Sequence, residues 1–93
     1  MRDYELIFII HPDLDENAFS EIVNRVNGWI TEAGGTVDKT DLWGKRRLAY
    51  PIRKLVEGQY VLMQANFPAE FCASLERNFR YLEPVLRFLV ISK

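Results

Sequence analysis

Apolar and polar positions along this chain predict four strands and two helices. Aromatic and β-branched side chains dominate residues 4–10, where apolar residues occupy both parities from Leu6 onward, as in a central strand covered on at least one face. This strand should end at His11–Pro12. Between Phe19 and Ala33, apolar residues recur at helical spacing, which predicts an amphipathic helix.

Both helices have residues typical of helix termini. Asp13 or Asp15 can cap the first helix by accepting a hydrogen bond from a free backbone N–H group, and Gly34–Gly35 stops it. We expect a second helix to start at Pro68 and to stop before Pro84. Its apolar stripe consists of Cys72, Leu75, Phe79 and Leu82, supported by Phe71.

Residues 36–52 form an unusually long extended segment after the first helix. Gly44 is predicted to make a β-bulge in it, and Pro51 confines its far end to an edge of the sheet. We expect a turn near residues 55–58 and a third strand over residues 59–67.

With a last strand over residues 85–91, the order of elements is βαββαβ, the split βαβ arrangement of ferredoxin-like domains in the α+β class. Right-handed crossovers then pack both helices on one face of a four-stranded antiparallel sheet whose central strands are the first and the third. The other face of the sheet stays uncovered by helices.

Charge is distributed unevenly along the chain. Residues 1–44 hold nine acids and three bases, a formal charge of −6, whereas residues 45–93 hold four acids and nine bases, a formal charge of +5. Five of the twelve basic residues fall within residues 45–54, which contain no acid. Such a basic strand is typical of a surface that binds phosphate. The alternative is an edge strand whose Lys and Arg side chains prevent aggregation.

Composition limits the classes of protein that remain. Ninety-three residues, 48% of them apolar, suffice for one domain that covers residues 1–93 and folds without disulfides. The single Cys72 has no partner for a disulfide or for metal-ligand spacing, which indicates a reducing compartment such as the cytoplasm and no bound metal. The apolar run Leu6–Ile10 is too short for a signal peptide, so nothing directs the chain to export or to a membrane.

Candidate catalytic groups are few. His11 is the only histidine and precedes a proline, which favours a turn residue, and Cys72 lies on an apolar helix stripe. The acids Asp13, Asp15 and Glu16 cluster at a helix start, where capping and the helix dipole explain them. No phosphate-binding glycine motif is present. We therefore expect a protein that is not an enzyme and that takes neither a cofactor nor a small-molecule substrate.

The main alternative is a small ferredoxin-like enzyme or ligand-binding domain. In that case a homodimer would enclose a pocket between uncovered sheet faces, with Ile7, Ile9 and Leu89 among its lining residues. A general protein-interaction domain is a third possibility. An RNA-recognition motif fits poorly, because residues 57–62 lack the leading base and the second aromatic residue of that motif.

The sequence resembles one known family, that of the sixth protein of the bacterial small ribosomal subunit, the S-six family. The resemblance rests on Met1-Arg2-x-Tyr4-Glu5, on the run from Gly44 to Lys54 that contains Arg-Arg-Leu-Ala-Tyr-Pro-Ile, on Gly58-x-Tyr60, and on Val85-x-Arg87 with Lys93. It covers essentially the whole chain. One departure is Asp3, which stands where many relatives have a second basic residue.

This resemblance implies a ribosomal protein that binds the central domain of small-subunit ribosomal RNA as a heterodimer with the eighteenth protein of that subunit. The residues best suited to RNA contact are Arg2, Lys45, Arg46, Arg47, Arg53, Lys54 and Arg87. The residues best suited to partner contact are Trp43, Leu48, Ala49, Tyr50 and Pro51. Core packing of Leu48 and Ile52, and ordinary cross-strand packing of Trp43, remain open as alternatives.

Overall fold

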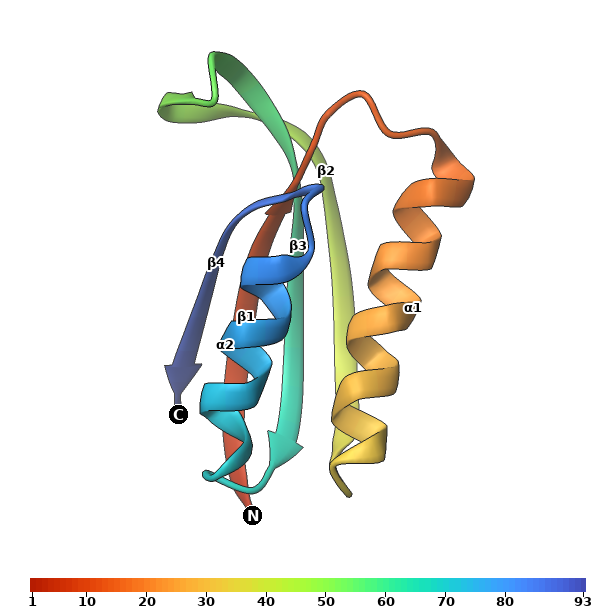
Figure 1. Cartoon of the computed structure of the whole chain (residues 1–93), viewed down its shortest axis with the longest axis vertical. Coiled ribbons are helices and arrows are strands. Elements are labelled where there is room, and N and C mark those ends of the chain that lie inside the picture. Colours follow the sequence, from red (N-terminus) through yellow and green to blue (C-terminus); the bar gives the residue numbers. More distant parts are fainter.

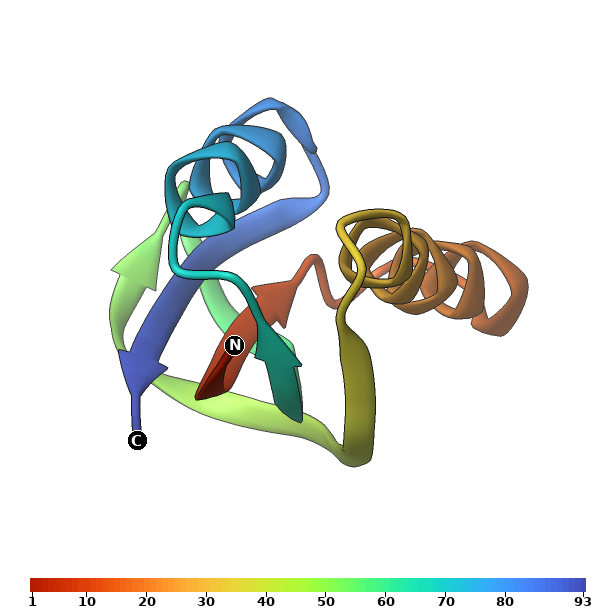
Figure 2. The same cartoon turned by 90° about the horizontal axis from the view of Figure 1, so that it is seen from below.

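The computed structural model describes residues 1–93, and its four-stranded antiparallel sheet has the order β2-β3-β1-β4 (Figure 1). Both helices lie on the same face of this sheet, as Figure 2 shows from below. The predicted ferredoxin-like fold is therefore confirmed, with the first and third strands at the centre. The elements are β1 (Arg2–Ile10), α1 (Glu16–Glu32), β2 (Thr36–Ile52), β3 (Leu55–Phe67), α2 (Phe71–Tyr81) and β4 (Val85–Ser92).

The core lies between the sheet and the two helices. Successive strand residues point to opposite faces, so alternate residues of the central strands face the helices. Phe79 of α2 lies at the centre, with its ring centroid 5.1 Å from that of Phe8, 5.6 Å from that of Trp29 and 5.2 Å from that of Phe88. The fully buried residues include Leu6, Phe8, Ile10, Val26, Ile30, Val61, Met63, Phe67, Leu75 and Phe79.

The ends of α1 follow from local chemistry. The side chain of Asp15 accepts a hydrogen bond from the backbone N–H of Ala18 at 2.8 Å, which satisfies one of the free donors at the helix start. Of the two predicted caps, Asp15 is thus the one used. At the other end Gly34 has a φ of +86°, a left-handed conformation that glycine adopts without steric strain.

We expect Asp15→Ala to lower the free energy of unfolding by about 1 kcal/mol, because α1 would lose its N-cap hydrogen bond. Asp13→Ala is the matched control, since the Asp13 side chain makes no hydrogen bond or ion pair in the structure. Urea unfolding of both variants measures the difference. Equal losses in the two variants would contradict the assignment of the cap.

Three predicted boundaries are wrong. The turn between β2 and β3 is made by Arg53 and Lys54, and residues 55–58 belong to β3. Helix α2 begins at Phe71 because residues 68–70 form a turn closed by the hydrogen bond from the N–H of Phe71 to the carbonyl of Pro68. Strand β1 begins two residues earlier than expected, at Arg2.

The predicted bulge at Gly44 is confirmed. It determines which side chains of β2 point toward the helices and which point away from them. The register with β3 shifts between Leu42 and Gly44, where φ is +79°. Leu42 pairs with Val61 and shares its helix-facing side. Beyond the bulge, Arg46 pairs with Gly58 on the opposite side. We call this side, which the helices do not cover, the open face.

The far part of the β2–β3 hairpin curls over the open face. Figure 2 shows β2 passing along the side of the sheet that is opposite the helices. Leu48 is only 8% exposed there, and its neighbours are Gly58 and Ile9. Gly58 makes this contact possible, since a Cβ atom at residue 58 would overlap the Ile9 side chain. Burial of Leu48, one of the alternatives for this residue, is therefore confirmed. Its contact with Gly58 and Ile9 lies on the open face, outside the main core between the sheet and the helices.

Candidate nucleic-acid and partner interface

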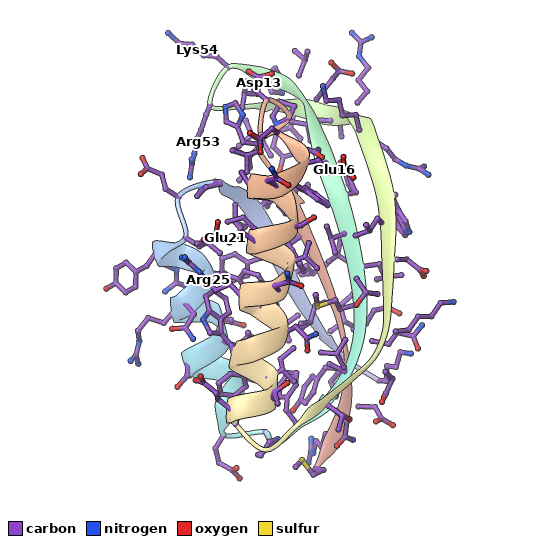
Figure 3. The ribbon with its side chains drawn as sticks, turned by 90° about the vertical axis from the view of Figure 1, so that its right-hand side faces the viewer. Asp13, Glu16, Glu21, Arg25, Arg53 and Lys54 are labelled. Atoms are coloured by element: carbon purple, nitrogen blue, oxygen red, sulfur yellow. The ribbon has the colours of Figure 1, made fainter.

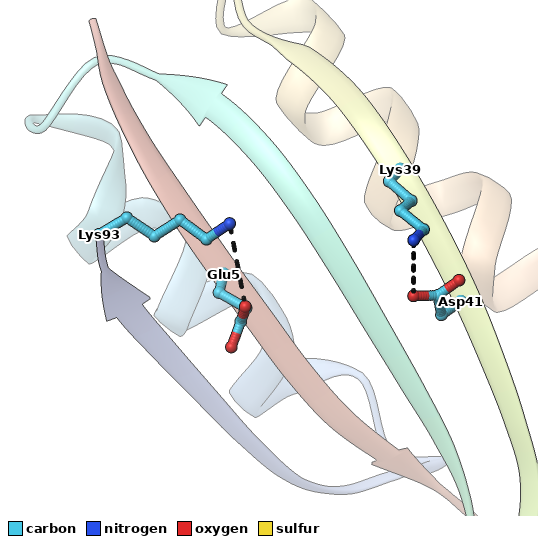
Figure 4. Close-up of polar contacts among 4 residues, drawn as sticks. All are labelled: Glu5, Lys39, Asp41 and Lys93. Atoms are coloured by element: carbon cyan, nitrogen blue, oxygen red, sulfur yellow. Dashed lines mark ion pairs between the residues drawn. The ribbon is translucent and has the colours of Figure 1, made fainter.

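One end of the open face is polar. The Nζ atom of Lys93 lies 4.0 Å from Oε2 of Glu5, and that of Lys39 lies 3.7 Å from Oδ2 of Asp41. Figure 4 shows both ion pairs. Register places Glu5 beside Ile91 and Asp41 beside Leu62, all on the open face. Exposed pairs of this kind contribute at most about 1 kcal/mol each. This end of the face thus carries two internal ion pairs beside the apolar side chains of Leu62 and Ile91.

The other end of the open face is aromatic and basic. The Trp43 ring stacks on Tyr60 with a centroid separation of 6.2 Å and an interplanar angle of 12°. The guanidinium of Arg46 lies 5.3 Å from the Trp43 ring centroid, and that of Arg87 lies 5.1 Å from the Tyr50 ring centroid. We call these five residues, from β2, β3 and β4, the Arg–aromatic face.

Each arginine of this face is held by a ring while its N–H groups remain available. A cation over an aromatic ring is stabilised by about 0.5–1 kcal/mol at an exposed site. The contact limits the motion of the guanidinium and leaves its edge free to donate hydrogen bonds to phosphate or carboxylate oxygens. The arrangement therefore suits recognition of a phosphate backbone next to an apolar partner surface.

The structure divides the seven residues predicted to contact RNA into separate groups. Lys45, Arg46 and Arg47 are exposed on the hairpin, and Arg87 reaches the same hairpin through Tyr50. Lys45 pairs with Gln59 on the side away from Arg46, so neighbouring basic side chains of the hairpin point to opposite sides. Phosphate contacts are thus available from both sides of the hairpin.

The remaining three lie at the two ends of the sheet. Arg53 and Lys54 form the tip of the hairpin, where Lys54 projects away from the molecule and Arg53 turns back toward the α2–β4 connection (Figure 3). Arg2 pairs with Phe67, at the end of β3 that is remote from this tip. Arg2 is therefore not part of the basic hairpin surface.

The residues predicted to contact a partner differ in exposure. Trp43 is 41% exposed and Tyr50 is 52% exposed, and Ala49 and Pro51 are exposed as well. Leu48 differs, because its side chain is buried between the hairpin and the sheet, next to Gly58 and Ile9. Tyr60 was not among the predicted site residues, because its stacking on Trp43 depends on the exact pairing of β2 with β3.

Other ionisable groups lie apart from this face. His11 Nδ1 accepts a hydrogen bond from the N–H of Asp13 at 3.1 Å, which agrees with its predicted place in a turn. A hydrogen bond with the Cys72 side chain, together with burial, raises the pKa of the Tyr4 phenol beneath the helices. No three His, Cys, Asp or Glu side chains are grouped closely enough to hold a metal ion. Neither helix is long and apolar enough to cross a membrane.

Comparison with known proteins agrees with this architecture. The fold defines a ferredoxin-like α+β protein with an open, basic sheet face. Residues 3–92 match the family model described as ribosomal protein S6. The chain belongs to the ribosomal protein S6 family and is a structural component of the small ribosomal subunit, which in bacteria is cytoplasmic.

Individual relatives cover nearly the whole chain. It is 45% identical over 93 residues to small ribosomal subunit protein bS6 of Clostridium botulinum strain Hall, covering 100% of this chain and 99% of the relative. It is 44% identical over 92 residues to the bS6 protein of Clostridium novyi, covering 99% and 97% respectively. The crystal structure of 30S ribosomal protein S6 from Thermotoga maritima matches with a TM-score of 0.93 at 31% identity, over 99% of this chain and 87% of that one.

Proposed function

We propose that this protein binds the central domain of small-subunit ribosomal RNA as a heterodimer with the eighteenth small-subunit protein, without chemistry of its own. The observation that carries the proposal is the β2–β3 hairpin, which presents basic side chains on both of its sides and at its tip. In this role the protein supports assembly of the small subunit by holding RNA and partner together.

The charge of the hairpin supports RNA as one ligand. Lys45, Arg46 and Arg47 are all exposed and none of them forms an ion pair within the chain. Their charge is therefore available to phosphates. Contacts of this kind release counterions and give an affinity that falls steeply with salt, while contributing little sequence selectivity. Double-stranded RNA is recognised mainly by its shape and backbone, which suits such a surface.

The exposed rings of the hairpin support a protein as the second ligand. Trp43 and Tyr50 are large, half-exposed side chains fixed by stacking or by an arginine. Fixed aromatic side chains lose little entropy on binding and are frequent in the energetically dominant part of protein interfaces. Ala49 and Pro51 flank Tyr50 and leave its ring accessible. We assign this surface to the partner protein.

The experiment is to measure binding of the purified chain to central-domain RNA with and without the eighteenth small-subunit protein. We expect tight binding that requires the partner and that weakens markedly as salt rises from about 50 to 200 mM. Partner-dependent binding that is insensitive to salt would contradict the assignment of the basic hairpin to phosphate. Absence of binding in both cases, with the chain forming a homodimer, would favour the ligand-pocket alternative.

A further inference from the structure

A hollow of about 540 Å³ lies at the hairpin end of the molecule, where three connections meet. These are the β1–α1 loop, the β2–β3 turn and the α2–β4 loop. Its charged lining residues are Asp13, Arg53 and Glu83, one from each connection. Arg53 fixes two of the walls together, because its NH1 group donates a 2.9 Å hydrogen bond to the backbone carbonyl of Glu83. The size is within the usual range for a site that holds a small organic group.

The lining combines apolar and polar groups in a manner that suits a nucleobase. Leu14, Leu55 and Pro84 provide apolar surface against which a planar ring can pack. The carboxylates of Asp13 and Glu83 have no hydrogen bond or ion pair within the chain. All their acceptor positions are thus available to a ligand that donates hydrogen bonds.

Two basic groups and one imidazole complete the hollow and its rim. Since Nδ1 of His11 accepts the backbone N–H of Asp13, the neutral ring carries its proton on Nε2 and can donate from there. Arg53 uses one nitrogen on Glu83 and keeps its other N–H groups. Lys54 extends from the rim (Figure 3). Arg53 and Lys54 therefore provide positive charge where the phosphates attached to a bound base would lie.

The backbone of the turn is strained. Arg53 has a φ of +51° and Lys54 a φ of +65°, so two successive residues with side chains adopt the left-handed conformation. Turns of this type usually contain Asn-Gly, because residues with larger side chains adopt this conformation only at an energetic cost. Such strain is common where side chains at a turn have a function. The strained pair places one cation in the hollow and one at its rim.

We propose that this hollow receives the base of one unpaired guanosine of the ribosomal RNA, with Arg53 and Lys54 binding its adjoining phosphates. The inference rests on the proposed RNA-binding function and adds the RNA element that is recognised. Guanine fits best because its N1–H and N2–H groups lie side by side and match the two oxygens of one carboxylate. Uracil presents one N–H between two carbonyl oxygens, which a carboxylate repels, and adenine and cytosine offer only an exocyclic amine as donor.

The test uses the double variant Asp13→Asn/Glu83→Gln in complex with the partner protein and central-domain RNA. Kethoxal, which reacts with N1 and N2 of unpaired guanines, probes the atoms that the carboxylates would engage. We expect the wild-type complex to protect one unpaired guanine that the double variant leaves reactive. We also expect the double variant to bind RNA roughly tenfold more weakly or worse, since a bidentate contact is lost.

The sign of the change in affinity separates this proposal from a simple charge effect. Removing two negative charges near RNA should strengthen binding if only electrostatic repulsion matters. The control Glu32→Gln/Glu70→Gln makes the same change in net charge at the opposite end of the molecule, where both residues are exposed. If the double variant binds as well as this control and leaves the same guanines protected, the inference is overturned while RNA binding stands. If the wild-type protein binds no RNA, the proposed function fails as well.

Discussion

Replacing Lys45, Arg46 and Arg47 together by alanine is expected to weaken binding of central-domain RNA roughly 10- to 100-fold near physiological salt. The three side chains are exposed on the two sides of one hairpin. The slope of log affinity against log salt is negative, and each phosphate contact that is removed makes it less negative by about one. The slope of the triple variant should therefore be about three less negative than that of the wild type. The loss of affinity should therefore shrink as salt rises, because the wild-type contacts are themselves screened.

A matched control removes the same charge from the helices. Arg25, Arg77 and Arg80 are exposed on α1 and α2, on the face of the sheet opposite the hairpin. Their triple alanine variant should bind RNA nearly as well as wild type. Binding is measured by filter retention or fluorescence anisotropy across a salt series, with circular dichroism to confirm folding. Similar losses in the two triple variants would show that net charge, and not the hairpin, determines affinity.

Gly58→Ala is expected to lower the free energy of unfolding by about 1–3 kcal/mol, because the added methyl group would overlap Ile9 beneath the curled hairpin. Ile9 is 9% exposed and is attached to a central strand, so it cannot move aside easily. The hairpin must shift instead, which would separate Leu48 from its neighbours. Urea unfolding measures the loss, and the near-ultraviolet circular dichroism of a Trp29→Phe background, in which Trp43 is the one tryptophan left, reports the shift.

Two further variants test the cause. Combining Gly58→Ala with Ile9→Ala should destabilise less than the sum of the single effects, since the second change removes the atom that the new methyl group meets. Gly28→Ala is the control, because no atom lies within 4 Å of a Cβ at that helical position. Gly28→Ala should raise the free energy of unfolding by about 0.5–1 kcal/mol. Additive effects of Gly58→Ala and Ile9→Ala would refute the proposed overlap.

The same glycine explains why one turn was misplaced from the sequence. Glycine is common in turns, so Gly58 indicated a turn in the sequence. In the structure its lack of a side chain lets Leu48 and Ile9 pack together across the open face. The actual turn at Arg53–Lys54 contains neither glycine nor asparagine and is held by the side-chain hydrogen bond to Glu83. Local preference cannot predict a turn that depends on a contact thirty positions away.

Periodicity predicted other features well. The stripe of α1 and the mixed parity of β1 indicated a helix over a central strand, and both are confirmed because burial of an apolar face dominates local structure. The run from Gly44 to Lys54 indicated the family, which the comparisons confirm. Cross-strand packing of Trp43 was one of the two alternatives, and the structure shows it, but the partner ring Tyr60 depends on the exact pairing of β2 with β3, which the sequence pattern does not define.

The strand order has a consequence for synthesis of the protein. Strand β1 is made first, yet its hydrogen-bond partners are β3 and β4, the last two strands to be made. An incomplete chain that stops before Val85 leaves an edge of β1 unpaired and lacks Arg87. The Arg–aromatic face is therefore complete only after β4 has joined β1, because Arg87 reaches Tyr50 of the hairpin from that last strand.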